Sequence, residues 1–326
     1  MTPPRFPLAV LPTPLARAHR LEAVLGRRPV LLKRDDLVGF AAGGNKIRPL
    51  EYLLGQALAD RCDVLVTGGG PSSNFCPAAA VAARAAGLAC ELVVWGEVRG
   101  SVNLAIATAA GACIRATGDE AREALDAAIE ARAAELAAAG RRPFPVPRGG
   151  STPLGAVGFA VAAAELAAQL GRAAVTAAAV AEPALVVLAV GSGASCAGLL
   201  AAGPLWPVLG VSVSRPPQEI AGNVRALGEA CARLLGNPPP HPELLEIVDA
   251  RGLGFGIASS ADRAAARLAL HTEGLLLDDT YGAKAFAVLT QRAGAAGGPV
   301  VFWHTGGLVP AVTALGRRYW EDGYDD

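Results

Sequence analysis

Lysine is scarce in this chain of 326 residues, which carries it only at Lys33, Lys46 and Lys284. Arginine supplies nearly all of the positive charge, and the 29 basic side chains balance the 29 acidic ones. Because the net charge is zero, the composition gives no drive toward nucleic acid or an anionic membrane, and we expect neither as a partner. Each of the three lysines is a candidate for a specific role.

The chain also lacks a CxxC pair and a basic leader followed by a long apolar stretch. Its most apolar stretch, residues 173–190, is rich in alanine and is interrupted by Glu182 and Pro183. That stretch is too weakly apolar for a membrane span. We therefore expect no membrane partner, no metal site and a cytoplasmic location, with the six cysteines as reduced thiols.

Short β-rich runs alternate with helical patterns along the chain, which is 52% hydrophobic and 18% charged. Length and composition suit one large or two modest domains. The alternation is typical of α/β folds with parallel strands. The expected strands are 63–66, 90–95, 113–116, 185–190, 208–213 and 300–303. The expected helices include 50–58, 121–140 and 155–170. An expected loop is 237–242.

A glycine-rich turn, residues 191–198, follows an expected apolar strand and leads into a helical pattern. Backbone N–H groups and a helix N-terminus would there face an anion, so the turn is a candidate phosphate cup. Its spacing matches neither the dinucleotide-binding motif nor the P-loop. Similar turns also occur only for tight packing, and the motif alone leaves both interpretations open.

A second candidate anion site is Pro71-Ser72-Ser73-Asn74, which follows another expected strand and precedes an alanine-rich helix. Ser and Asn at such places commonly cap the helix. The same donors can bind a carboxylate, so this segment also has two interpretations.

Lys46 stands at the entrance of a helix, directly after Gly43-Gly44-Asn45. The positive end of the helix disfavours the ammonium and lowers its pKa, which a lysine that forms a Schiff base requires. Lys33 precedes the acidic pair 35–36, whose carboxylates would stabilise its ammonium, and Lys284 lies within a helical pattern. We expect structural roles for these two lysines.

Motifs along nearly the whole chain resemble the fold type II pyridoxal-phosphate enzymes, specifically the 1-aminocyclopropane-1-carboxylate (ACC) deaminase and D-cysteine desulfhydrase family. The resembling segments are Thr13-Pro14-Leu15, Lys33-Arg34-Asp35-Asp36, Gly43-Gly44-Asn45-Lys46, Ser73-Asn74, Gly149-Gly150-Ser151, the glycine-rich turn, Val213-Ser214-Arg215, Leu277-Asp278 with Tyr281 and Lys284, and His304-Thr305-Gly306-Gly307. The resemblance implies pyridoxal 5′-phosphate as the cofactor and a small amino acid as the substrate.

The resemblance implies a cofactor-binding role for several of these residues. Lys46 would carry the cofactor as a Schiff base, the internal aldimine, and Asn74 would hydrogen-bond its phenolic oxygen. Thr305 would contact the cofactor as well. The phosphate would be held by Gly191, Ser192, Gly193, Ala194, Ser195 and Cys196.

On the substrate side, the resemblance makes Ser73 and Tyr281 catalytic residues. Ser72 replaces the family's usual glutamine, but its N–H or hydroxyl can still face the substrate carboxylate. Two positions depart from the family: Phe75 replaces a histidine or glutamine, and Phe255 replaces a tyrosine. We expect both phenylalanines to bind the substrate, which favours a less polar substrate side chain than that of cysteine or ACC. The alternative is that they pack in the core, as most phenylalanines do.

A third departure is Gly282, where the family has glutamate or threonine after the tyrosine. It removes the usual partner of the cofactor's pyridine nitrogen, unless Thr305 or water substitutes.

The fold that the resemblance implies is a two-domain α/β fold like that of tryptophan synthase β, with parallel sheets covered by helices on both faces. A small domain, residues 48–150, would be inserted into a large cofactor-binding domain made of residues 1–47 and 151–326. The cofactor would lie in the cleft between them, and the protein would be a homodimer.

The leading functional hypothesis is a lyase or deaminase that acts through Lys46, by elimination or ring opening, and releases a keto acid and ammonia. A second hypothesis is a β-substitution synthase, in which another nucleophile captures the intermediate. A third, suggested by the changes at positions 75, 255 and 282, is a catalytically retired protein that binds the cofactor.

Overall fold

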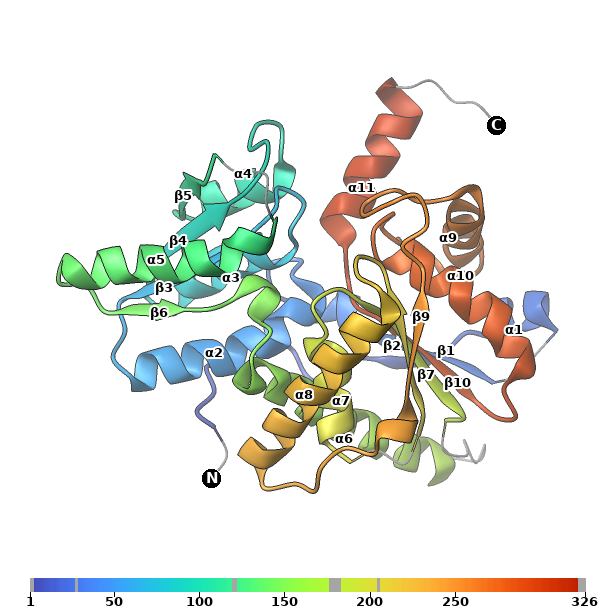
Figure 1. Ribbon diagram of the computed structural model, residues 1–326. Coiled ribbons are helices and arrows are strands. Elements are labelled where there is room, and N and C mark those ends of the chain that lie inside the picture. The colour runs from blue at the N-terminus through green and yellow to red at the C-terminus, as the bar shows by residue number, and fades with distance from the viewer. Residues whose placement is uncertain (1–2, 27–28, 119–121, 176–182, 204–205, 322–326) are drawn as a thin grey trace.

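The computed structural model describes residues 3–26, 29–118, 122–175, 183–203 and 206–321 and contains two sheets (Figure 1). The six-stranded sheet has the order β1-β2-β10-β7-β8-β9, and the four-stranded sheet has the order β5-β4-β3-β6. All pairs are parallel except β1 with β2. The strands are β1 (Leu15–Arg17), β2 (Val30–Arg34), β3 (Val64–Gly69), β4 (Ala89–Val94), β5 (Cys113–Ala116), β6 (Pro143–Pro145), β7 (Leu185–Val190), β8 (Val208–Ser212), β9 (Leu245–Asp249) and β10 (Val300–His304).

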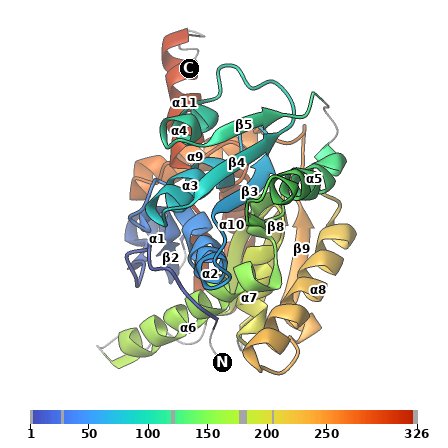
Figure 2. The same ribbon diagram turned by 90° about the vertical axis from the view of Figure 1, so that its left-hand side faces the viewer.

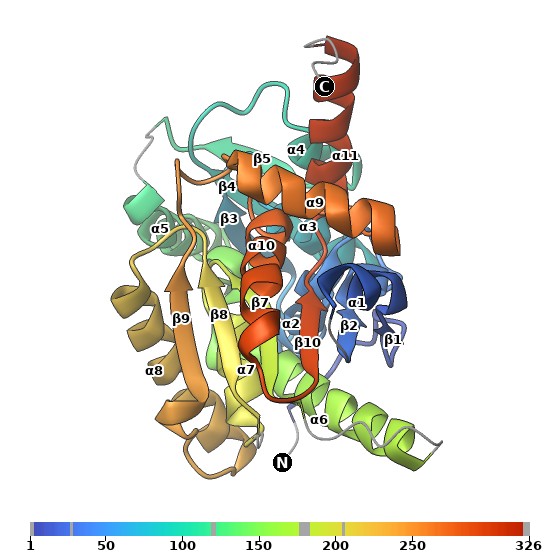
Figure 3. The same cartoon turned by 90° about the vertical axis from the view of Figure 1, so that its right-hand side faces the viewer.

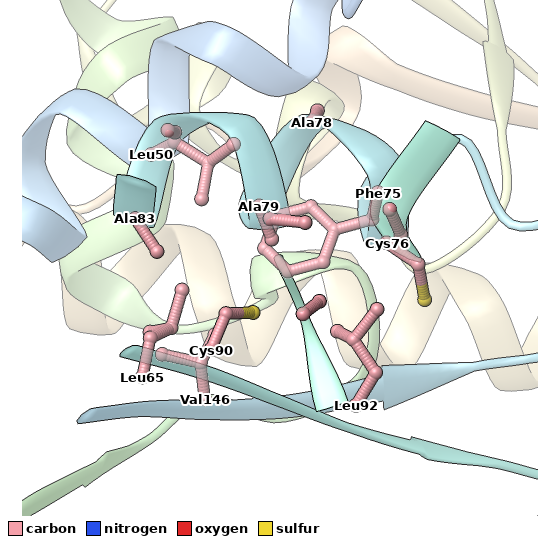
Figure 4. Close-up of a cluster of buried hydrophobic side chains, with 14 of the residues drawn as sticks. Leu50, Leu65, Phe75, Cys76, Ala78, Ala79, Ala83, Cys90, Leu92 and Val146 are labelled. Carbon is pink, nitrogen blue, oxygen red and sulfur yellow. The ribbon is translucent and has the colours of Figure 1, made fainter. Parts of the chain in front are cut away.

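Helices cover both faces of the small sheet: α2 (Ile47–Ala59), α3 (Phe75–Ala85) and α4 (Val102–Ala109) on one side, and α5 (Leu125–Ala138) on the other (Figure 2). Figure 4 shows how α2 and α3 close over the sheet, with Leu50 and Ala83 facing Leu65 and Cys90. Burial on both faces explains why β3 and β4 are almost uniformly apolar.

The large sheet is likewise enclosed. The helices α1 (His19–Leu25), α9 (Ser260–Glu273) and α10 (Gly282–Arg292) pack on the face seen in Figure 3. The opposite face carries α6 (Pro153–Val175), α7 (Ala194–Ala201) and α8 (Pro217–Leu235). The last helix, α11 (Leu308–Gly316), continues into a π-helical turn (Arg317–Glu321). Short 3₁₀ turns occupy Asp35–Leu37, Gly44–Lys46, Arg122–Ala124, Arg148–Gly150, Pro242–Leu244 and Ala293–Ala295.

The expected α/β class is confirmed, and each expected strand is present within two or three residues of its predicted ends. The helix expected at 121–140 begins with the 3₁₀ turn at 122–124, while residue 121 lies outside the described residues, and the helix expected at 155–170 is the longer α6. Residues 237–242 connect α8 to the turn before β9, as expected of a loop. Four strands were not predicted: β1, β2, β6 and β9.

The stretch 173–190 lies partly outside the described residues and ends in β7. The neighbouring window Pro153–Gly171 of α6 is long and apolar enough to span a membrane, yet 56% of it is buried inside the protein. Core helices pass the same test of length and composition, so this feature assigns α6 no membrane role.

All four strands of the small sheet lie within residues 48–150, the segment predicted to be an inserted domain. The first helix of that segment, α2, also packs against α6 of the other segment. At this crossing a Cβ on Gly158 would lie 2.3 Å from the carbonyl oxygen of Arg48, so the two backbones are in close contact. The domain boundaries therefore stay a proposal.

A buried ionic network joins these segments. Arg48, at the start of α2, binds the carboxylate of Asp35 at 2.7 Å and that of Glu165 in α6 at 3.1 Å. Trp303 of β10 donates to Asp35 at 2.8 Å. Lys33 was expected to be stabilised by the carboxylates that follow it in sequence. The charge of Asp35 does favour its ammonium, but its ion-pair partner in the structure is Glu165.

Candidate active site

The residues expected to bind cofactor and substrate gather in one pocket, at the carboxyl ends of strands from both sheets. Gly69 and Trp95 reach it from the small sheet, and Val190 and Thr305 reach it from the large one. Of the predicted site residues, only Ala194 does not line this pocket; those that do are Lys46, Ser72, Ser73, Asn74, Phe75, Gly191, Ser192, Gly193, Ser195, Cys196, Phe255, Tyr281 and Thr305. Ligands in α/β folds bind at such strand ends.

Lys46 caps the N-terminus of α2, and its side chain is partly accessible from the pocket. Surrounding protein nevertheless encloses the amine, and this burial lowers the pKa of Lys46 from 10.5 to about 8. The sequence had suggested the helix terminus as the cause, whereas desolvation is the one that the structure identifies. Nζ makes no hydrogen bond to another described residue, so nothing there holds the amine away from a ligand.

The backbone around Lys46 is fixed by a contact with the end of β10. Asn45 donates its N–H to the Thr305 carbonyl at 2.8 Å. A Cβ on Gly44 would lie only 2.5 Å from the same carbonyl oxygen, and Gly44 has a φ of +55°. Glycine is therefore needed at position 44 for the turn that carries Lys46 to approach Thr305.

The glycine-rich turn connects β7 to α7 and has the geometry of an anion cup. Gly193, at the N-terminus of α7, has a φ of +103°, and a Cβ there would lie 3.1 Å from Val224. Asn45 donates to the Ser195 hydroxyl at 3.1 Å, which orients that hydroxyl. Burial raises the pKa of Cys196 to about 12, so its thiol stays protonated and adds no negative charge.

The Ser-Asn segment forms the N-terminus of α3. Ser73 Oγ accepts long hydrogen bonds from the N–H groups of Phe75 and Cys76, at 3.3 and 3.4 Å, which is the capping role that one interpretation foresaw. The hydroxyl proton can still be donated into the pocket. Asn103 of α4 donates to Asn74 Oδ1 at 3.3 Å and thereby directs the Asn74 amide nitrogen elsewhere.

Tyr281 and Phe255 form one wall of the pocket. Their rings meet edge to face, with centroids 5.9 Å apart and an angle of 84° between the planes. A Cβ on Gly191 would lie 3.1 Å from the Tyr281 ring, so the glycine-rich turn leaves room for the phenol. Phe255 is 42% exposed and faces the pocket, as predicted for a substrate-facing residue.

Phe75 differs from Phe255 in its surroundings. It borders the pocket, but its side chain is 2% exposed and belongs to the hydrophobic cluster beneath α3, where Figure 4 places its ring near Ala79 and Leu92. A Cβ on Gly150 would lie 2.9 Å from the ring. This burial favours the core-packing alternative for Phe75, while a contact between its ring edge and the substrate stays a prediction.

Gly282 does not leave an open space. A Cβ there would lie 3.2 Å from Leu277 and 3.3 Å from Asp278 Oδ1. Asp278 lines the pocket and accepts hydrogen bonds from the N–H groups of Thr280, Tyr281 and Gly282. Burial raises the pKa of Asp278 to about 6 against the opposing effect of these three donors.

Several site residues escaped the sequence analysis: Asn45, Trp95, Asn103, Arg148 and Asp278. Trp95 directly follows β4, and an aromatic residue at the end of a parallel strand is a signal that could have identified it. Asn45 binds the Ser195 hydroxyl and the Thr305 carbonyl. Asn103 binds the Asn74 side chain and the Ser73 carbonyl, and no motif marks such contacts. Among the described pocket residues, Lys46, Arg148 and Asp278 are those with charged side chains.

The donor set fits pyridoxal phosphate. Its aldehyde needs an amine of lowered pKa, which Lys46 supplies, and its phosphate needs a cup of N–H and O–H donors, which the start of α7 supplies. The buried Ser151 hydroxyl has no partner among the described residues. A Cβ on Gly149 would lie 4.0 Å from this hydroxyl oxygen and 3.0 Å from Ser192 Oγ. The Ser151 hydroxyl is therefore close to the cup.

Comparison with known proteins agrees with this fit. The family model "Pyridoxal-phosphate dependent enzyme" matches residues 7–306. A Pyrococcus abyssi protein provisionally named a 1-aminocyclopropane-1-carboxylate deaminase is 35% identical over 330 residues, covering 98% of this chain and 96% of that protein. The D-cysteine desulfhydrase of Salmonella newport is 34% identical over 325 residues, covering 95% and 96%. A crystal structure of an ACC deaminase homologue has a TM-score of 0.86 at 31% identity, covering 94% and 93%.

Proposed function

The chain belongs to the family of pyridoxal-phosphate-dependent enzymes, and we propose that it is a lyase or deaminase of small amino acids with Lys46 as the covalent cofactor site. The cofactor is pyridoxal 5′-phosphate, and the fold is that of the fold type II enzymes. The observation that carries the proposal is the enclosed Lys46 amine, which shares a pocket with the N-termini of α3 and α7.

We assign each side chain a part in binding. The α7 cup and Ser195 would hold the cofactor phosphate, the Asn74 amide would donate to the phenolic oxygen, and Thr305 would contact the pyridine ring; all of them line the pocket. Thr305 is our candidate for the nitrogen partner, since Asp278 is already bound by three N–H groups. When bound, the cofactor withdraws electrons from the α carbon of an attached amino acid.

Side chains that line the pocket would bind the substrate and transfer protons. Ser72 and Ser73 bind the substrate carboxylate at the positive end of α3. The Lys46 amine would take a proton from the substrate, and the Ser73 and Tyr281 hydroxyls would assist, since all three groups line the same pocket. Loss of that proton and of a β substituent, followed by hydrolysis, gives a keto acid and ammonia.

The test is a screen of D- and L-amino acids against the holoenzyme, in which the absorbance of the bound cofactor reports binding and assays of keto acid and ammonia report turnover. We expect at least one small amino acid to shift the spectrum and release both products. A shifted spectrum whose product contains an added thiol or amine would favour a β-substitution synthase instead. A cofactor spectrum without turnover of any amino acid would favour the catalytically retired protein.

We also propose a cytoplasmic homodimer that binds neither nucleic acid nor a membrane. The zero net charge of the chain supports the expectation that it binds neither nucleic acid nor a membrane. Helix α11 stands out from the body of the protein in Figure 1, and its Leu308 and Val312 are 41% and 52% exposed. This exposed apolar surface supports the homodimer. Sedimentation of the holoenzyme tests the dimer, and a monomer at all concentrations would contradict it.

A further inference from the structure

Residues 251–257, here called the rim loop, follow β9 and contribute Phe255 to the wall of the pocket. Three of its side chains are largely in solvent: Leu253 is 74% exposed, Phe255 42% and Ile257 47%. Gly252, Gly254 and Gly256 alternate with them and have φ values of +54°, +139° and +82°. Apolar side chains this exposed bury little surface. The loop has hydrogen bonds of its own: the Arg251 guanidinium binds the Asp249 carboxylate, and the N–H groups of Gly254 and Ile257 donate to the carbonyls of Arg251 and Gly254.

Lys284 supplies a further attachment, which ties the rim loop to α10. It lies on α10 and is only 1% exposed. Its ammonium donates to the Arg251 carbonyl at 2.8 Å and to the Gly254 carbonyl at 3.0 Å. Burying an ammonium is costly unless its donors are used, and here two of them are used on the backbone of the rim loop.

The same helix touches the rim loop a second time. Tyr281 caps α10 and lies one turn before Lys284, so both residues share one face of the helix. The Phe255 ring, next in sequence to the carbonyl that Lys284 binds, packs edge to face on Tyr281. Lys284 thus fixes the backbone directly beside the aromatic pair that lines the pocket.

We propose that Lys284 is a positioning residue for substrate specificity: it holds the rim loop so that Phe255 closes the pocket against Tyr281 and favours amino acids with an apolar side chain. This inference rests on the proposed function. Without the ammonium, the carbonyls of Arg251 and Gly254 each lose a donor, and the rim loop opens. Phe255 then leaves the pocket, while Lys46 and the phosphate cup stay in place.

The first arm of the test is chymotrypsin digestion of the holoenzyme, which reads the rim loop without any catalysis. Lys284→Met should speed cleavage after Leu253 or Phe255 about tenfold or more, because hydrogen bonds from a charged donor are lost. Lys284→Arg keeps donors and should restore protection. Lys33→Met is the matched control, since it removes the other buried structural lysine and should leave cleavage at the rim loop unchanged. Equal cleavage of Lys284→Met and the wild type would overturn the anchoring role.

The second arm measures binding of alanine and norvaline, each in both configurations, from the spectrum of the bound cofactor. We expect the wild type to prefer norvaline, and Lys284→Met to lower that preference by a factor of about 3 to 10. Phe255→Ala should give the same loss, and the double variant should lose no more than either single one. If Lys284→Met does not fold, Lys284→Gln should show the same effects at a smaller size.

The two arms separate this inference from the proposed function. A wild type whose spectrum responds to no amino acid would refute the proposed function and the specificity role together, whereas digestion would still decide the anchoring. An unchanged norvaline preference in a folded Lys284→Met enzyme that binds amino acids would refute the specificity role alone.

Discussion

The Lys46 amine has a lowered pKa because protein surrounds it, and this fixes the pH at which it can react. Below about 8 it is an ammonium, and above that value it is the neutral amine that attacks an aldehyde. Covalent loading of the apoprotein should therefore speed up about tenfold per pH unit below this pKa and level off above it. Stopped-flow absorbance after mixing with pyridoxal phosphate measures the rate. A rate that still climbs beyond about pH 10 would mean an unperturbed lysine.

Phe75 and Phe255 are the same residue type in opposite surroundings, at 2% and 42% exposure. Phe75→Ala should cost about 3–5 kcal/mol of unfolding free energy, as for a phenylalanine in the core, and leave substrate preference unchanged. Phe255→Ala should cost about 1.5 kcal/mol or less and change the preference. Urea unfolding and the amino-acid screen measure the two effects, and each variant is the control for the other. Similar losses of stability in both would contradict these placements.

At the residue scale, the sequence indicated which side chains could react better than it indicated what surrounds each side chain. The sequence identified Lys46 because lysine is scarce and two glycines precede it. It could not show that Phe75 points beneath α3, since that depends on the distance between α3 and the small sheet. Asn103 was missed because it acts through Asn74, a contact between residues 29 positions apart.

Among the elements, the N-terminus of α7 depends most closely on one residue. Gly193 has a left-handed backbone, and a side chain there would press on Val224. Gly193→Val should shift the turn and weaken cofactor binding about tenfold or more, because the N–H groups no longer converge on the phosphate. Gly236→Val, at the left-handed end of α8 with open space around it, controls for backbone strain. Equilibrium dialysis of pyridoxal phosphate measures affinity, and equal values for the two variants would argue against the cup.

Most of the strands that the sequence predicted well are buried on both faces, although β5 was predicted too and is largely exposed. Strands such as β7 and β8 are continuous apolar runs and stand out. The missed strands lack that signal: β6 has proline at both ends, and β2 ends in Lys33 and Arg34. These segments form strands because of their positions in the sheet and because a buried counter-ion balances their charge. Neither cause can be read from the local sequence.

For the molecule as a whole, the buried network around Arg48 joins α2, α6 and the large sheet. Arg48→Met should leave Asp35 and Glu165 without their main partner and cost about 3–5 kcal/mol at neutral pH. Arg48 lowers the pKa of both carboxyls, so its stabilising effect is present above their unfolded pKa values and is lost as the pH falls.

Urea unfolding at a series of pH values tests this prediction. The difference between wild type and Arg48→Met should shrink as the pH falls below about 4, because the carboxyls that Arg48 stabilises are then protonated. The exposed pair Arg292–Glu246 offers a control, and Arg292→Met should cost about 1 kcal/mol or less at any pH. A pH-independent difference for Arg48→Met would mean that packing, not charge, is lost.

At this scale the resemblance supplied what local patterns could not. The assignment to fold type II is confirmed by the match to residues 7–306 and by the ACC deaminase homologue. Periodicity alone predicted α/β layers but neither the order of strands nor the pairing of Lys33 with Glu165, because those contacts join residues 132 positions apart.

The central claim is that Lys46 carries the cofactor, and borohydride reduction followed by peptide mapping tests it most directly. Only three lysines compete, and Lys33 and Lys284 are each already bound to acceptors in the protein. We predict that reduction fixes the pyridoxyl group on the peptide that contains Lys46 and that Lys46→Ala removes the label while the protein stays folded. A label on Lys33 or Lys284, or one that persists in folded Lys46→Ala, would contradict the account.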